Sequence, residues 1–205
     1  MGRHGAVTVE DVMRATGVGR TMAYRRIARC AEAGLLERLA VLHCEPALIR
    51  ATREGLRYAG LPFPVAEISP GSVTHWLRCA ATAHALCEHF GAERVLTERE
   101  IAYAERMEGR PLASAEIGTL RNGERQLHRP DLAALTAEGM LAVEVELTPK
   151  SPSRLAKIMS AWRAARWVSK VSYVSPPGQT RRAVKRAVKT ARADNKVVVL
   201  EKVTW

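Results

Sequence analysis

The sequence predicts a mixed α/β protein built from two domains. Near the amino terminus, two short helical patterns are separated by glycines, and two strand-like runs follow them. A proline-rich stretch at 61–71 then breaks both helical and strand patterns. Beyond it, helices and strands alternate to the end of the 205 residues. We therefore expect one domain at residues 1–61 and a second at residues 72–205, each with a modest core.

Two helices are expected at the start of the chain. Thr8 can cap the first helix, and two acids stand in its favourable first turn. Residues 16–19 contain two glycines and predict a turn. A second helix is then expected at 21–33, because Gly34 is a good helix terminator.

Two short strands are expected after these helices, at 35–38 and 41–43. Residues 51–58 then resemble the strand-to-helix return of winged-helix regulators. The order of helix, glycine turn, helix and strand pair is typical of a winged helix-turn-helix domain that binds double-stranded DNA.

The second of these helices carries the candidate base-reading residues. Ala23, Ile27, Cys30 and Ala31 form its core stripe. The residues expected to contact DNA are Thr21, Arg25, Arg26 and Arg29. Arg25 and Arg29 are one turn apart and could both enter a major groove, where arginine favours guanine. An arginine-bearing helix can also be only a solvated face, but the order of the elements favours DNA binding.

The net charge of +11 is unevenly distributed. Residues 1–60 carry a net charge of +4, residues 61–149 carry −5, and residues 150–205 carry +12. Two basic segments therefore flank an acidic centre. Binding to a polyanion is the natural interpretation, because phosphate neutralisation supplies most non-specific affinity for nucleic acid. Binding to a membrane surface is the competing use of a basic helix.

A helix expected at 180–193 concentrates this positive charge. Its basic residues on one side are Arg181, Arg182, Lys185, Arg186, Lys189 and Arg192. No acid stands three or four residues away to relieve the repulsion, and each like-charge pair costs a few tenths of a kcal/mol. A solvated face would normally mix signs. We therefore expect this helix to contact phosphates, along the duplex that flanks the first domain.

Three carboxylates stand on two adjacent strands that are expected near the middle of the second domain. Glu144 and Glu146 alternate with apolar residues, so both point to one face of their strand. Asp131 on the neighbouring strand can join them. Buried acids are costly unless a cation or hydrogen bonds compensate, and carboxylate oxygens suit Mg²⁺ or Mn²⁺. A solvated edge strand with isolated acids is the alternative interpretation.

Other elements of the second domain follow from periodicity. The expected elements are a helix at 73–90, a strand at 94–97, an irregular insertion at 104–126, a helix at 153–166, a strand at 167–174 and a closing strand at 196–203. Together with the two strands that carry the acids, they give the order αβββαβ with one added αβ pair.

The run HRPDLAAL…EVELTPKSPSRL resembles the core of PD-(D/E)XK nuclease-fold proteins, and more narrowly the bacterial replication-relaxation family. These proteins join a winged helix to such a domain. The resemblance implies that Asp131 matches the motif aspartate and Glu144 the acid of (D/E)XK. Glu146 stands where lysine is usual, as in some restriction endonucleases. Lys150 would then be a displaced lysine or a phosphate contact.

Two functions follow from these patterns. The first is a sequence-specific DNA-binding regulator of transcription or replication, serving a bacterial mobile element, plasmid or host gene, and able to act as a homodimer. The second is a metal-dependent endonuclease targeted by the winged helix. In that case the metal ligands are Asp131, Glu144 and Glu146, with Lys150 completing the catalytic set.

Several further residues admit two interpretations. His128 could orient a water or contact phosphate, or it could be a hydrogen-bonded structural histidine. Glu98 and Glu100 could supply a fourth carboxylate, although acids at the start of a helix would look the same.

The four cysteines show no C-x-x-C spacing. Cys79 and Cys87 could bind zinc with His84, but their positions on an apolar helical stripe favour buried thiols. No run of residues is apolar enough to span a bilayer, and the first residues lack the apolar core of a signal peptide. A cytoplasmic protein that does not bind membranes is therefore expected.

Overall fold

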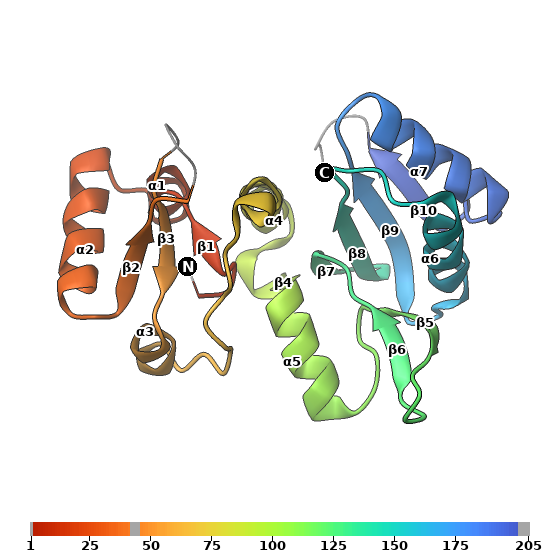
Figure 1. Cartoon of the computed structure of the whole chain (residues 1–205), viewed down its shortest axis with the longest axis horizontal. Coiled ribbons are helices and arrows are strands. Elements are labelled where there is room, and N and C mark those ends of the chain that lie inside the picture. The colour runs from red at the N-terminus through yellow and green to blue at the C-terminus, as the bar shows by residue number, and fades with distance from the viewer. Residues whose placement is uncertain (1, 42–45, 201–205) are drawn as a thin grey trace. The chain divides into compact units, whose positions relative to one another are not determined.

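The computed structural model describes residues 2–41 and 46–200 and mixes helices with strands, which confirms the predicted α/β class (Figure 1). The chain divides into two compact units, residues 1–84 and 85–205. Each unit has its own sheet. No helix in the described parts of the chain is both long and apolar enough to cross a membrane.

The two helices predicted for the first unit are confirmed as α1 (Val9–Thr16) and α2 (Arg20–Glu32). Thr8 begins α1 with a capping box: its Oγ1 accepts a hydrogen bond from Asp11 N (3.1 Å), and Asp11 Oδ2 accepts one from Thr8 N (2.9 Å). Gly17 ends α1 with a left-handed conformation, φ 67°. A three-residue turn therefore separates the helices.

A three-stranded antiparallel sheet follows, in the order β1 (Ala6–Val7), β3 (Leu48–Ala51) and β2 (Leu36–Leu39). The strand predicted at 35–38 is confirmed as β2. Its partner is β3 and not the segment predicted at 41–43: Val41 is outside any strand, and residues 42 and 43 lie outside the described residues. Burial explains the choice, because Leu48 and Ile49 supply the core side chains.

Two helices complete this part of the chain. Thr52 caps α3 (Arg53–Tyr58), as expected of a strand-to-helix return. Helix α4 (Pro70–Phe90) begins after an irregular segment. Val73 near its start packs with the first sheet, as does Ala80. The compact units therefore divide at 84/85, inside α4, whereas the sequence suggested a boundary at 61–71.

The second unit is built on a five-stranded mixed sheet, with the strand order β10-β9-β8-β7-β4. The strands are β4 (Val95–Thr97), β7 (Leu132–Thr136), β8 (Gly139–Val145), β9 (Val168–Val174) and β10 (Val197–Leu200). Strands β4, β7 and β8 pair antiparallel, and β8, β9 and β10 pair parallel. A short 3₁₀ turn, η1 (Ala92–Arg94), precedes β4. The part of the predicted closing strand beyond residue 200 lies outside the described residues.

The prediction of an irregular insertion at 104–126 is wrong. This segment holds the end of α5 (Glu98–Glu108), strand β5 (Ala115–Thr119) and the start of β6 (Arg125–His128). Strands β5 and β6 pair as an antiparallel hairpin with a register shift next to Gly118. The many Glu, Arg and Gly residues obscured a strand pattern that the bulge also interrupts.

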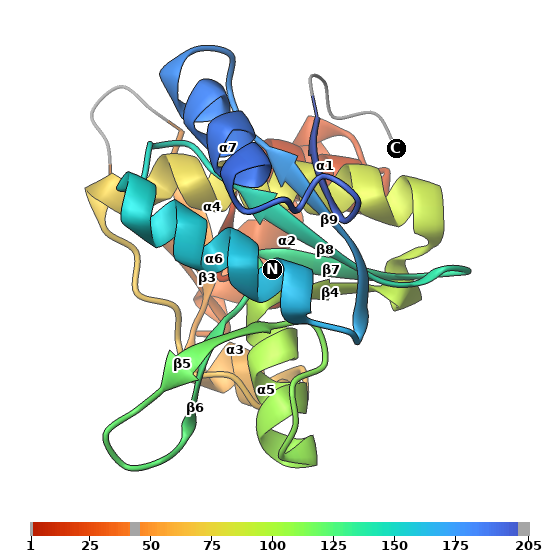
Figure 2. The ribbon, with the colours of Figure 1, turned by 90° about the vertical axis from the view of Figure 1, so that its right-hand side faces the viewer.

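Helices α6 (Pro152–Ala164) and α7 (Gln179–Thr190) share one hydrophobic core with β8 and β9. Figure 2 shows both helices over the strands of this sheet. Trp162 is fully buried at the centre of the core, beside Val171 and Val184. The two helices therefore cover the same face of the sheet, the face toward which Ala142 of β8 also points.

Candidate functional site

The strand register places the three predicted carboxylates on one face of the second sheet. Leu132 pairs with Val143, so Asp131, one residue earlier, stands opposite Glu144. Glu146 follows Glu144 by two residues and shares its face. This is the face that α6 and α7 cover, because Ala142 has the same parity. The structure thus brings Asp131, Glu144 and Glu146 together, as their spacing predicts.

Two of these carboxylates are deeply buried, since Glu144 is 4% exposed and Glu146 is 5% exposed. His128, at the end of β6, lies beside the first of them: its Nε2 is 2.7 Å from Glu144 Oε1. The contact lacks the alignment of a standard hydrogen bond, and neither atom has another hydrogen-bond partner. The ring of His128 also packs edge-on to Trp162, with centroids 5.7 Å apart. Of the two interpretations of His128, the structure favours the structural one, because the ring lies against Glu144 and Trp162.

The pKa values of Glu144 and His128 both differ from their ordinary values. Burial raises the pKa of the Glu144 carboxyl, and the neighbouring Asp131 adds to the rise while His128 opposes it. Burial, the largest single influence, would lower the pKa of His128, but the charge of Glu144, its contact with the ring and the charge of Asp131 together outweigh burial, and the pKa is raised. Both groups therefore hold protons more tightly than they would in water.

The remaining carboxylates each have a partner. Asp131 Oδ2 accepts a hydrogen bond from Val145 N at 2.7 Å. Glu146 forms an ion pair with Lys150. Among the described residues, the three carboxylates do not form a group whose ligand oxygens all lie within 4.8 Å of one another. A divalent ion held by all three would therefore require Glu146 to release Lys150.

Tyr173 also belongs to this site, although the sequence predicts it only as part of a strand. It pairs in register with Glu144 on the neighbouring strand β9 and is buried. Burial, followed by the charge of Glu144, raises the pKa of Tyr173 well above its ordinary value. The alternation of Val171 and Tyr173 along β9 is the sequence signal that could have placed it on this face.

A second buried carboxylate, Glu105 of α5, was not singled out from the sequence. It accepts hydrogen bonds from the backbone N–H groups of Leu112 (3.0 Å), Ala113 (3.2 Å) and Ser114 (3.0 Å). It also accepts from Ser114 Oγ (2.8 Å) and from Arg129 Nε (3.2 Å). Every bond serves the fold, so we interpret Glu105 as structural. The sequence signal for its burial was its position one helical turn after Ile101, on the same face of α5.

One of the two acids at the start of α5, Glu100, caps that helix. Glu100 Oε2 accepts hydrogen bonds from Thr97 N and from Thr97 Oγ1, both at 2.9 Å. The backbone N of Glu98 donates to Asp131 O at 2.9 Å. The structure thus favours the helix-start interpretation for Glu100, and places the backbone of Glu98 next to the carboxylate site.

The candidate DNA-reading residues all lie on the exposed side of α2. These residues are Thr21, Arg25, Arg26 and Arg29. Ala23 and Ile27 on the opposite side are buried in the first core. The predicted division of the helix into a core stripe and an arginine face is therefore confirmed.

Helix α7 shows the same division. Arg182, Lys185, Arg186 and Lys189 are exposed, and the apolar side of the helix is buried. Arg181 differs from the others, because its guanidinium donates two hydrogen bonds to Ser175 O, from Nε (3.1 Å) and Nη2 (2.6 Å). This residue holds the start of the helix to the end of β9, in addition to any role in binding.

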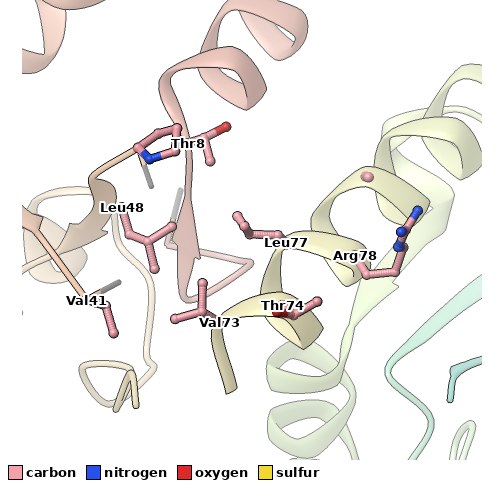
Figure 3. A pocket seen from close by; sticks show the side chains of 9 residues that line it. Thr8, Val41, Leu48, Val73, Thr74, Leu77 and Arg78 are labelled. Atoms are coloured by element: carbon pink, nitrogen blue, oxygen red, sulfur yellow. The ribbon is translucent and has the colours of Figure 1, made fainter. Parts of the chain in front are cut away.

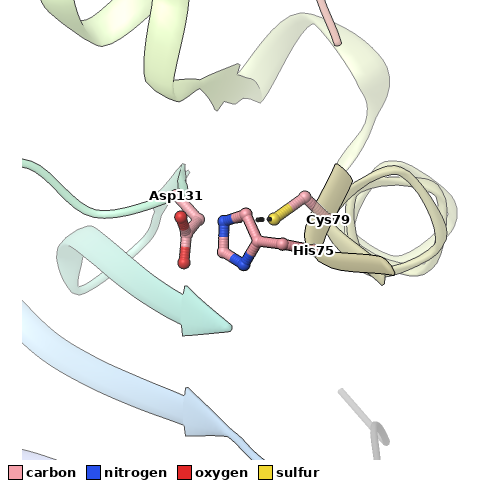
Figure 4. A group of neighbouring side chains, drawn as sticks. All are labelled: His75, Cys79 and Asp131. Atoms are coloured by element: carbon pink, nitrogen blue, oxygen red, sulfur yellow. Dashed lines mark hydrogen bonds between the residues drawn. The ribbon is translucent and has the colours of Figure 1, made fainter. Parts of the chain in front are cut away.

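Among the described residues, Cys30, Cys79 and Cys87 form no disulfide, and Cys44 lies outside the described residues. Figure 4 shows Cys79 on α4 beside His75. Its Sγ is 3.4 Å from His75 Nε2. Within residues 2–41 and 46–200, no metal-binding group joins Cys79 to Cys87 and His84. The zinc interpretation therefore has no support.

The first unit also contains a hollow of about 380 Å³ between β3 and α4 (Figure 3). Leu48, Val73 and Leu77 line it, and Arg78 extends away from Leu48. Its lining is mainly apolar and brings no set of charged groups together, so it offers no recognisable chemistry.

Comparisons of the chain with family models, with curated proteins and with solved structures found no match. The resemblance to replication-relaxation proteins therefore stays a prediction from the motif residues. What the protein does must be inferred from its surfaces and its carboxylate site.

Proposed function

We propose that this protein is a sequence-specific double-stranded DNA-binding protein whose first unit is a winged helix-turn-helix. The observation that carries the proposal is the exposed face of α2, where Arg25 and Arg29 stand one turn apart. Arginines so placed can each reach guanine in one major groove. The protein acts as a regulator of transcription or replication for a bacterial mobile element or plasmid, and its second unit is nuclease-like.

Three features of the first unit support this proposal. Helices α1 and α2 are joined by only three residues, and the antiparallel strands β2 and β3 follow directly. The buried stripe of α2 fixes the helix on the core, so its arginine face stays turned to solvent. The charge of +4 over residues 1–60 suits a phosphate backbone.

Replacing Arg25 or Arg29 with alanine is expected to remove about 1–3 kcal/mol of discrimination between the preferred duplex and a scrambled one. Much of the salt-dependent affinity should remain, because other cations still contact phosphates. Fluorescence anisotropy with a duplex selected from a random pool, and with its scrambled counterpart, measures the difference.

Arg53→Ala is the matched control for this experiment, since Arg53 is an exposed arginine of the same unit outside α2. It should leave the discrimination unchanged. Equal weakening of both duplexes by Arg25→Ala and Arg29→Ala would show that these arginines contact phosphates only, and would count against sequence reading by α2.

A second candidate function is that of a Mg²⁺- or Mn²⁺-dependent deoxyribonuclease. Glu144 Oε1 favours it, because this buried oxygen has no aligned hydrogen bond and lies beside Asp131 on one face. The donor set of carboxylate oxygens fits a hard cation. Asp131 and Glu144 would hold the ion, with Glu146 once Lys150 moves away. The ion would supply Lewis acidity and an activated water at a phosphodiester.

Millimolar Mn²⁺ is then expected to raise the melting temperature, because the ion binds only the folded state. The stabilisation is about 2.7 kcal/mol when the ion concentration is 100 times the dissociation constant. Glu144→Gln should abolish this rise, whereas Glu138→Gln, at an exposed acid in the β7–β8 turn, should not. Nicking of supercoiled DNA that disappears in Asp131→Ala would establish the nuclease. A melting temperature that no metal moves would argue for a metal-free second unit.

A further inference from the structure

Helices α6 and α7 together form one basic surface. No Asp or Glu occurs between residues 147 and 193. Exposed cations from the start of α6 and along α7 define what we call the α6–α7 basic face. Its members are Arg154, Lys157, Arg182, Lys185, Arg186 and Lys189. Sequence periodicity singled out only the cations of α7, because the fold alone shows that α6 lies beside it.

The two helices run side by side in the same direction. Each follows one of the parallel neighbours β8 and β9, so each begins at the same end of the sheet. At their other ends, Arg163 of α6 donates a hydrogen bond from Nη1 to Ala191 O, just after α7, at 2.8 Å. The first turns of α6 therefore lie level with the first turns of α7. Lys157 lies on the flank of α6 next to β5, where its Nζ is beside Gly118, so Arg154 and Lys157 add a second charged row on the side of α6 away from α7.

This concentration of like charge opposes folding. Like charges three or four residues apart on one helix repel one another. The repulsion is tolerated because the opposite side of α7 packs Val184, Ala187 and Val188 into the core. A solvated surface would gain from mixed signs, so a face without acids over two helices indicates a polyanionic ligand.

The side chains beside the cations decide which polyanion fits. A helix that binds a membrane surface inserts an apolar face, but the apolar side of α7 is already buried in the core. Single-stranded nucleic acid is bound by stacking on aromatic rings, and α6 and α7 expose none: their only aromatic residue, Trp162, is fully buried. Cations without aromatic or apolar neighbours suit the phosphates of a duplex.

We infer that the α6–α7 basic face is a second, sequence-neutral binding surface for the phosphate backbone of duplex DNA, separate from α2. Duplex DNA as the ligand follows from the proposed function. The cations belong to a different compact unit from Arg25 and Arg29. Affinity and sequence preference should therefore depend on different helices, and each can be removed alone.

The test compares full-length variants by measuring affinity for the preferred and the scrambled duplex over a range of salt concentrations. Changing all six residues of the face to glutamine should lower the slope of log affinity against log salt by up to about 0.9 for each lost contact. The ratio of affinities for the two duplexes should persist. Arg154→Gln with Lys157→Gln should alone lower the slope by up to about two, which tests the part of α6.

A control variant changes four exposed arginines of the second unit outside the face, namely Arg94, Arg110, Arg121 and Arg125, to glutamine. It should lower the slope less than the four-residue change Arg182, Lys185, Arg186 and Lys189 to glutamine. Circular dichroism and melting curves establish that each variant folds.

The outcomes separate this proposal from the function of α2. An unchanged slope in a folded six-residue variant would overturn the α6–α7 proposal and leave α2 untouched. Loss of preference in that variant, with its slope unchanged, would also overturn it. Binding of anionic vesicles or single-stranded RNA that the six changes abolish, without any effect on duplex binding, would assign the face to that ligand instead. A preference that survives Arg25→Ala with Arg29→Ala would overturn only the function of α2.

Discussion

Replacing Glu105 with alanine is expected to lower the free energy of unfolding by about 3–5 kcal/mol, because several buried donors lose their acceptor and each costs about 1–3 kcal/mol when left unsatisfied. The carboxylate is 4% exposed and accepts three backbone N–H groups from residues 112–114. Without it, these donors remain buried and unsatisfied, and Arg129 loses its partner. The turn between α5 and β5 should then open.

Urea denaturation measures this loss, and hydrogen exchange at Ala113 and Ser114 locates it. Glu105→Gln should cost less than alanine, because its amide oxygen can still accept from part of the turn. Glu108→Ala, an exposed change on the same helix, is the matched control and should alter stability by less than about 0.5 kcal/mol. A loss below about 1 kcal/mol in Glu105→Ala would mean that the turn does not depend on the carboxylate.

Replacing Glu144 and His128 together with leucine is expected to have the opposite effect and to stabilise the fold by about 1–4 kcal/mol, the range for exchanging both members of a buried ion pair for packed apolar side chains. Glu144 faces a core that contains Trp162 and Tyr173, and its Oε1 has no aligned hydrogen-bond partner. A methyl-bearing side chain of similar size would bury apolar surface there instead. Loss of metal binding in the same variant would show that the carboxylate serves function at the expense of stability.

This stabilisation should grow as pH rises. The folded-state pKa values of Glu144 and His128 both lie above their ordinary values of 4.5 and 6.5. A raised pKa means that the folded state binds more protons, so the stability from both groups is full at low pH. That stability is lost as pH rises from about 4.5 through the raised values. The double leucine change removes both titrating groups and, with them, this pH-dependent loss of stability.

Melting curves of the wild type and of the double variant Glu144→Leu with His128→Leu, between pH 5 and 8, measure both effects. Glu144→Gln separates the two causes, because it removes the titrating carboxyl but keeps a polar group in the core. It should flatten the pH dependence without matching the stability of leucine. A leucine variant that is less stable than wild type at every pH would show that the contact with His128 holds the fold together.

The sequence predicted the features that local rules decide. The capping box of Thr8 and the buried stripe of α2 follow from neighbouring residues. The alternation of Glu144 and Glu146 with valines likewise set the carboxylates on one face, and pairing across the turn brought Asp131 to them.

The sequence did not predict the features that depend on contacts between distant parts of the chain. The partner of β2 depends on which apolar strand can complete the core. Leu48 and Ile49 of β3 do so, although the sequence pattern placed the partner strand at 41–43. The hairpin β5–β6 is held by Glu105, whose hydrogen-bond donors are brought to it only by the tertiary fold. The closeness of α6 to α7 likewise follows from parallel strand pairing that no local pattern specifies.

The turn between β7 and β8 sets the spacing of the whole carboxylate site. Thr136 pairs with Gly139, and Thr136 Oγ1 donates to Gly139 O at 2.8 Å, so only two residues separate the paired ends. Gly139 has φ 114°, a conformation that few other residues adopt without strain. Strand pairing repeats every two residues, so one residue more or less here would bring valines to the covered face and carry Glu144 and Glu146 to the other. The length of this one turn therefore decides on which face of the sheet Glu144 and Glu146 lie. A single insertion or deletion there would move both carboxylates away from the covered face together.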